Sequence, residues 1–236
     1  MNGLIALVGS GEYLPVMEDV DRHLLESLHL NGRKPHVVCL PTAAGQEGDE
    51  SVNRWSRMGF EHFQKLGADV ISLRIINKET ADDPQHESVL ENADFIYFSG
   101  GNPQYLHDTM QGSRAWTAMQ KAWTKGAVYA GCSAGAMILA KQIPSFRLFS
   151  TVEGFGIVPA KYVFPHFDAV PAMFKPLISA LTGRLKKGER MIGVDEDTAL
   201  VGRLDGEWRV MGKSRVQVFT HEGKTTYESG QTLLLD

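Results

Sequence analysis

Residues 128–137 read VYAGCSAGAM, and this stretch decides the fold. A short apolar run leads into Gly-x-Ser-x-Gly centred on Ser133, and a helix-forming segment follows. Glycine at positions 131 and 135 removes the side chains that would clash where a strand turns sharply into a helix. The stretch therefore predicts a nucleophile elbow, with the Ser133 hydroxyl facing a cleft at the carboxyl end of a parallel sheet. The competing interpretation is an ordinary helix start capped by Ser133.

Similar apolar runs occur upstream of this stretch and alternate with segments of helical period. Nearly continuous apolar runs are typical of buried parallel strands. They predict strands at residues 4–8, 36–40, 69–75, 94–98 and 127–130, and helices at residues 19–30 and 51–66. This alternation predicts an α/β fold, with a mostly parallel sheet sandwiched by helices.

The pattern changes after about residue 140. Residues 155–164 look extended, residues 172–185 look helical, and short strands separated by Asp-Gly, Glu-Gly and Ser-Gly turns follow residue 199. Such turns predict antiparallel hairpins. We expect them on the edge of the main sheet because they bring no core helices of their own, and we expect residues 1–236 to form a single α/β domain.

The composition excludes several classes of protein. The chain has 24 Lys plus Arg against 28 Asp plus Glu and is 43% hydrophobic, which indicates a globular protein without the basic surface of a nucleic-acid binder. Its apolar runs fall short of the ~20 residues needed to span a bilayer, and the first residues lack the basic start of a signal peptide. Two cysteines provide neither a disulfide framework nor a zinc spacing. We expect a cytoplasmic protein that uses no cofactor or metal and binds neither nucleic acid nor a membrane.

A second glycine-rich turn follows the strand that precedes the elbow. Residues 95–103 read FIYFSGGNP, a buried strand that opens into a glycine pair. Acyl transfer needs two N–H donors for the developing oxyanion, and the amides of Gly101 and Ala134 are the natural pair. Asn102, directly after the pair, is a candidate contact to substrate. Taken alone, Gly-Gly-Asn-Pro is only a turn signal.

A serine nucleophile needs a base, and His166 is the candidate among the eight histidines. It lies in YVFPHF at residues 162–167, at the end of an extended segment where aromatic neighbours can hold an imidazole toward a cleft. A packed histidine at a strand end is the alternative interpretation.

Seven motifs in order carry a resemblance to a known family. They are GSGE (9–12), LPTAAG (40–45), FSGGNP (98–103), GCSAGAM (131–137), GFGIVP (154–159), FPHF (164–167) and GVDEDTAL (193–200). The set resembles peptidase family S51, which contains aspartyl dipeptidase (dipeptidase E) and cyanophycinase, serine hydrolases on the class I glutamine-amidotransferase-like fold. The resemblance implies Ser133 as nucleophile, His166 as its base, and the amides near Gly101 and Ala134 as the oxyanion hole. It also implies small peptide substrates, cleaved after an N-terminal aspartate or at β-aspartyl-arginine linkages.

The carboxylate that would complete a triad departs from the family pattern. The resemblance places an acid between the serine and the histidine, yet residues 138–151 contain no Asp or Glu. Glu153 is the one acid between Ser133 and His166 and is the predicted orienter of His166. Asp168, Asp195 and Glu196 are the alternatives. The arginines that some family members carry soon after the histidine are also missing, so the resemblance supplies no aspartate-binding arginine. Lys175 or Arg184 could take its place, although the charged stretch from Arg184 to Arg190 is more simply a solvated helix end and loop.

Two further acids follow predicted strands. Glu12 and Glu196 are candidates to rim the cleft and to pair with a substrate amine or guanidinium, although acids are mostly plain surface carboxylates.

The sequence thus predicts a serine peptidase or amidase that forms an acyl-enzyme on Ser133 with a small peptide. The missing acid motivates an alternative, a non-catalytic family member that binds a small molecule or peptide. An α/β-hydrolase-type esterase also shares Gly-x-Ser-x-Gly, but there the histidine normally lies near the end of the chain. A glutaminase is disfavoured because the Cys132 thiol should point into the core. A homodimer is the candidate assembly.

Overall fold

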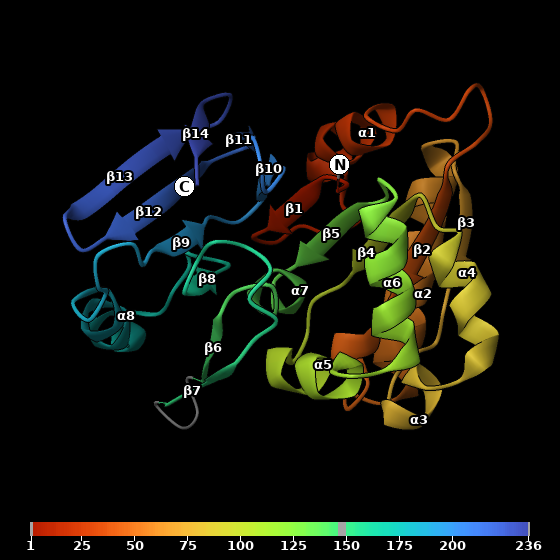
Figure 1. Ribbon diagram of the computed structural model, residues 1–236, viewed down its shortest axis with the longest axis horizontal. Helices are drawn as coiled ribbons and strands as arrows, with labels where there is room; N and C mark the ends of the chain where they lie inside the picture. Colours follow the sequence, from red (N-terminus) through yellow and green to blue (C-terminus); the bar gives the residue numbers. More distant parts are fainter. Residues whose placement is uncertain (1, 146–149, 236) are drawn as a thin grey trace.

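The computed structural model describes residues 2–145 and 150–235 (Figure 1). Within these residues the strands form an eight-stranded sheet, a four-stranded sheet and a two-stranded ribbon. The eight strands of the large sheet follow the order β14-β11-β10-β1-β5-β4-β2-β3. The mostly parallel α/β architecture predicted from the sequence is confirmed.

The centre of the large sheet is parallel. Its strands are β1 (Ile5–Val8), β2 (His36–Leu40), β3 (Asp69–Ser72), β4 (Phe95–Phe98) and β5 (Val128–Cys132). The register sets Val8 opposite Cys132, and Phe98 opposite Gly131. The loops that follow β1, β4 and β5 therefore leave the sheet at the same edge, where open α/β sheets bind ligands.

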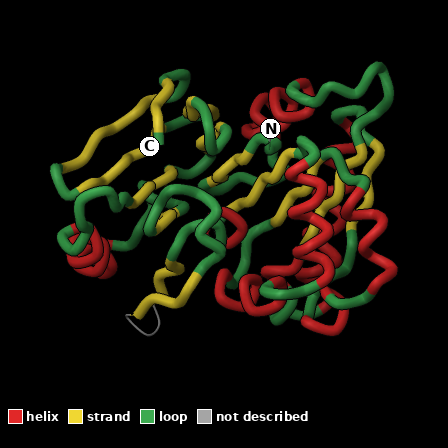
Figure 2. The backbone as a smooth tube through the Cα atoms, viewed as in Figure 1, coloured by secondary structure: helices red, strands yellow, loops and turns green. Residues whose placement is uncertain are grey.

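Helices cover both faces of this parallel part, as the ribbon and the tube show (Figures 1 and 2). Side chains such as Val37 and Cys39 pack in one cluster with residues of α1 and α2, while Val38 and Leu40 pack in another with residues of α4 to α7. The helices are α1 (Glu18–Glu26), α2 (Asp49–Lys65), α3 (Lys78–Ala81), α4 (Glu87–Glu91), α5 (Pro103–Met110), α6 (Arg114–Thr124) and α7 (Ala134–Met137). Helix α1 ends at Glu26, before the predicted residue 30, and Leu28 still packs against the core from beyond the helix end.

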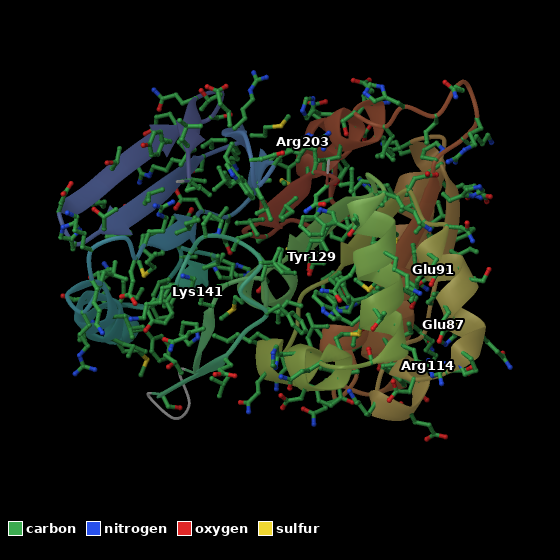
Figure 3. The ribbon with its side chains drawn as sticks, in the orientation of Figure 1. Glu87, Glu91, Arg114, Tyr129, Lys141 and Arg203 are labelled. Atoms are coloured by element: carbon green, nitrogen blue, oxygen red, sulfur yellow. The ribbon has the colours of Figure 1, made fainter. Side chains whose placement is uncertain are left out.

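Ion pairs join the two outer helices α4 and α6. Glu87 and Glu91 on α4 lie opposite α6, where Arg114 is labelled (Figure 3). Arg114 contacts Glu87 at 2.9 Å and Lys121 contacts Glu91 at 2.6 Å. These exposed pairs each contribute little, and the apolar face of α6 supplies most of the packing.

The C-terminal strands divide between the two larger sheets. Strands β10 (Thr198–Gly202), β11 (Glu207–Gly212) and β14 (Thr232–Leu234) extend the large sheet in antiparallel fashion beside β1, as predicted. Strands β12 (Arg215–Thr220) and β13 (Gly223–Glu228) instead join β9 (Met191–Val194) and β8 (Tyr162–Phe164) in the four-stranded sheet. The apolar face of β12 packs there because Val216 and Val218 lie opposite β9.

One hydrophobic cluster connects the two sheets. It contains Leu7 and Phe98 from the large sheet together with Val163 and Ile192 from the small one. Helix α8 (Lys175–Thr182), after a short 3-10 turn at Ala172–Phe174, packs on the other face of the small sheet. The ribbon of β6 (Gln142–Ser145) and β7 (Ser150–Glu153) lies near both β8 and α5. No helix within the described ranges is long and apolar enough to cross a membrane.

Candidate active site

Ser133 lies at the tip of a sharp turn between β5 and α7. Its backbone has φ 49° and ψ −104°, a left-handed conformation that costs a non-glycine residue about 1–3 kcal/mol. The turn is held in place because the Ser133 amide donates to the Val8 carbonyl at 2.9 Å. A side chain at Gly131 would place its Cβ 2.4 Å from the carbonyl of Gly135, so only glycine fits. The strand-turn-helix context of the elbow is confirmed.

A buried tyrosine on β5 stabilises the same turn through a hydrogen bond. Tyr129, labelled in Figure 3, lies on β5, and its hydroxyl donates to the Gly135 carbonyl at 2.9 Å. That hydrogen bond ties the first turn of α7 to the strand that precedes Ser133. The serine is therefore presented by a packed segment rather than by a loose loop.

The glycine pair after β4 adjoins the serine. A Cβ built on Gly100 would lie 3.9 Å from Ser133 Oγ. Gly101 has φ 146°, and a Cβ there would lie 2.4 Å from the Ala43 carbonyl oxygen, which explains why glycine is required. Among the described residues the amides of Gly101 and Ala134 have no hydrogen-bond acceptor. Neither amide is therefore occupied by another group in the described part of the chain, and the Ala134 amide belongs to the residue that follows Ser133.

His166 and Glu196 meet where two parallel strands of the small sheet end. Strands β8 and β9 are paired with Phe164 opposite Gly193. His166 lies two positions after the end of β8, and Glu196 lies two positions after the end of β9. His166 Nδ1 lies 2.8 Å from Glu196 Oε1. A carboxylate accepts from Nδ1–H, which leaves the lone pair of the neutral ring on Nε2. His166 also has a positive φ of 49°, so its backbone is held in an uncommon conformation.

The predicted orienter Glu153 is not the residue beside His166. It lies at the end of β7, is exposed, and pairs across the ribbon with Gln142. Its neighbour Val152 lines the cleft described below, and successive side chains of a strand point to opposite faces. The residue that contacts His166 is Glu196, one of the alternatives. The small sheet brings this carboxylate from downstream of the histidine, which the chain order expected for the acid did not anticipate.

The other two alternatives have different partners. Asp168 Oδ1 accepts the backbone amide of Glu196 at 2.8 Å, so it holds the segment that carries the carboxylate. The Asp195 side chain is fully buried, accepts from Ser214 Oγ at 2.8 Å and lies 3.3 Å from Arg215 Nε. The pKa of Asp195 is raised above its usual value, mainly by burial and further by the Asp168 charge, against the opposing effects of the Ser214 hydrogen bond and the Arg215 charge.

Glu12 also differs from its expected place at the rim. It is only 8% exposed, and its two oxygens are occupied: Oε1 accepts the Gly100 amide at 2.8 Å and Oε2 accepts the Cys132 thiol at 3.0 Å. Burial, together with the nearby Glu12 charge, raises the pKa of Cys132, which keeps the thiol neutral. Cys132 is fully buried, as predicted. Glu12 therefore links the two segments that lead into the glycine pair and the elbow.

Ser133 and His166 line the same cavity, of about 670 Å³, which we call the cleft. Asn102 lines it too, and its side chain caps α5 by accepting the Tyr105 amide at 3.1 Å. Among the described residues no hydrogen bond joins Ser133 Oγ to His166, an arrangement common in unliganded enzymes, where catalytic contacts tighten on binding. The described residues also contain no cluster of three or more potential metal ligands.

Comparison with known proteins identifies the family. The model of peptidase family S51 matches residues 4–207. The chain belongs to peptidase family S51. Its members in this comparison include the cyanophycinase of Geminocystis herdmanii, which is 26% identical over 85% of this chain and 78% of its own length. The Nostoc cyanophycinase is also 26% identical, but the match covers only 63% of that protein.

Solved structures agree with this family assignment. A peptidase from an acI-B1 Actinobacterium superposes with a TM-score of 0.89 and 35% identity, over 99% of this chain and 97% of that one. A peptidase E protein from Listeria monocytogenes has a TM-score of 0.65 at 21% identity, over 91% of this chain and all of that one, and shares the fold. The predicted family is confirmed, and family membership makes this chain a peptidase-type hydrolase.

Proposed function

We propose that this protein is a serine peptidase or amidase in which Ser133, His166 and Glu196 form the catalytic triad. The observation that carries the proposal is the 2.8 Å contact of Glu196 with His166, which lines the same cleft as the strained Ser133 elbow. A serine and a histidine in one cleft, with a carboxylate on the histidine, are the parts that acyl transfer requires.

The reaction proceeds in two halves. Ser133 Oγ attacks the substrate carbonyl while His166 Nε2 takes its proton, and the oxyanion binds the amides of Gly101 and Ala134. His166 then gives the proton to the leaving amine, the C–N bond breaks and an acyl-enzyme remains. Water attacks this ester, His166 takes a proton from the water and returns it to Ser133, and the acid is released. Glu196 stabilises the imidazolium in both halves.

The contact between His166 and Glu196 also bears on the alternative, a family member that binds without catalysis. A binding protein without catalysis was considered because residues 138–151 lack an acid. Glu196 supplies the carboxylate from another part of the chain. We therefore favour catalysis over binding alone. We further propose that the substrates are small peptides, that the enzyme acts in the cytoplasm and that it uses no metal or cofactor.

Reaction with a fluorophosphonate tests the proposal without knowledge of the substrate. We expect one adduct per chain on Ser133, mapped by mass spectrometry. The rate constant for its formation should fall by at least about 10⁴-fold in Ser133→Ala and in His166→Ala. A folded protein that forms no adduct, or one that is labelled equally in both variants, would contradict the proposal.

A further inference from the structure

The walls of the cleft are mostly apolar beyond the reacting groups. Met137, Ile143 and Phe164 are at most 5% exposed, and Val152, Val170 and Phe174 also line the cavity. The uncharged polar side chains in the lining, besides Ser133, are Asn102 and Gln104. The residues come from α7, the β6–β7 ribbon, the end of β8 and the segment before α8. They line the same cavity as Ser133 and His166.

Charge is sparse in this space. Among the described residues that line the cleft, His166 is the one ionisable side chain, and its Nδ1 is already paired with Glu196. Lys175 follows Phe174 but is exposed at the start of α8 and is not part of the lining. Among residues 2–145 and 150–235, a substrate carboxylate would find no cationic partner in this lining to offset the loss of its hydration, whereas an apolar group gains by leaving water.

The carboxylates near the cleft act in the same direction. Glu196 adjoins His166, and Asp168 accepts the Glu196 amide. Their negative charge repels an acidic side chain bound beside the histidine. Two independent features, the apolar lining and the sign of the nearby charge, therefore disfavour an aspartyl substrate.

We infer that the cleft is an acyl pocket for an uncharged, apolar side chain, so that the enzyme acts at peptides whose acyl residue resembles leucine or phenylalanine. This inference rests on the proposed function, because it takes Ser133 as the nucleophile. A volume of about 670 Å³ accommodates a side chain of that size together with its main chain.

Diphenyl aminoalkylphosphonates test the pocket directly. In such a probe Ser133 Oγ forms a bond to phosphorus, phenoxide leaves, and the serine proton passes through His166 to give phenol. Each probe carries only the acyl residue, so the leaving group is the same for leucine, phenylalanine and aspartate analogues. The rate of Ser133 modification should be about 100-fold higher for the leucine and phenylalanine probes than for the aspartate probe.

Two variants sharpen the test. Val170→Arg places a cation in the cleft and should reduce the preference for leucine over aspartate at least about tenfold, whereas the matched control Val170→Leu should leave it within about threefold.

The outcomes separate the two claims. Equal rates for leucine and aspartate, a faster aspartate probe, or no reaction with any of the three while the fluorophosphonate labels Ser133 would overturn the apolar pocket alone. A folded protein that the fluorophosphonate does not label at Ser133 would overturn both the pocket and the proposed function.

Discussion

The candidate site has two halves, and the chain holds them in different ways. The Ser133 half belongs to the large parallel sheet, where Glu12 is 8% exposed and bonds to both the glycine pair and the elbow. The His166 half belongs to the small sheet, where the side chains of His166 and Glu196 are 43% and 45% exposed. Buried contacts therefore hold the Ser133 half in place, and the His166 half is open to solvent.

The junction of the two halves lies in the segment between β9 and β10. The Asp197 amide donates to Ser10 Oγ at 3.2 Å, and the Gly9 amide donates to the Thr198 carbonyl at 2.8 Å. Glu196 thus sits in a link that joins the small sheet to the large one. Because the halves differ in burial, we expect substitutions on the exposed half to change the labelling rate with little effect on the free energy of unfolding. Substitutions in the buried half should change both quantities.

The largest effect is expected for the exposed carboxylate. Glu196→Gln removes the acceptor charge from His166 and should lower the rate constant of fluorophosphonate labelling about 10³-fold. The free energy of unfolding, measured in urea, should change by less than about 1 kcal/mol because the pair is partly solvated.

Glu153→Gln is the matched control for that variant. It changes the acid that the sequence alone favoured, and its labelling rate should stay within about twofold of the parent because Glu153 lies on the exposed ribbon. A 10³-fold loss in Glu153→Gln with an unchanged Glu196→Gln would reverse the assignment.

A smaller loss of rate, accompanied by lower stability, is expected from the buried half. Glu12→Ala leaves the Gly100 amide without its acceptor and should lower the free energy of unfolding by about 1–3 kcal/mol. The labelling rate should fall about tenfold as the glycine pair loses its alignment. Cys132→Ser retains a donor toward Glu12 Oε2 and should stay closer to the parent in both measurements. An unchanged stability in Glu12→Ala would show that the buried half is not held by this carboxylate.

The smallest effect is expected for a substitution in the large sheet at the end opposite the cleft, where only the free energy of unfolding should change. Asp94 accepts from both Arg33 nitrogens at 2.5 and 2.6 Å and from the His36 amide at 2.8 Å. Burial alone would raise the pKa of Asp94, but these hydrogen bonds lower it to below its usual value. Asp94→Asn should therefore lower the free energy of unfolding by about 1 kcal/mol at pH 7, with no change in the labelling rate.

The pH dependence of that difference follows from its sign. Because the pKa of Asp94 is lower in the folded than in the unfolded protein, its stabilisation is present above about pH 4 and is lost as the pH falls through the folded pKa. Urea unfolding between pH 7 and pH 3 measures it, with the exposed Asp205→Asn as control. A difference that grows toward low pH would contradict the assignment.

Much of the fold could be predicted from local pattern. The runs at residues 36–40 and 94–98 became strands nearly as predicted, because a buried parallel strand is apolar on both faces. The elbow could be predicted for a related reason: Gly131 is required by a contact with Gly135, four residues along the same turn, although Gly135 itself packs against Phe98 of the neighbouring strand. The placement of β12 and β13 could not, since strand partners are decided by long-range packing.

The candidate site divides in the same way. Gly101 and Ala134 lie within short motifs, so the sequence could single them out as candidates for the oxyanion hole. Their role there stays a prediction. The partner of His166 depends on the parallel pairing of β8 with β9, which no local pattern contains. The motif GVDEDTAL, which directs attention to Glu196, was the available signal. That residues 1–236 form one domain, and that the protein forms a homodimer, also remain predictions.

A crystal structure of the protein phosphonylated at Ser133 tests the central claim most directly. We predict that the phosphonyl oxygen lies about 2.7–3.1 Å from the amides of Gly101 and Ala134, with His166 Nε2 toward the serine oxygen and Nδ1 on Glu196. A phosphonyl oxygen bound elsewhere, or a His166 ring paired with Glu153 or turned away from Ser133, would contradict the account.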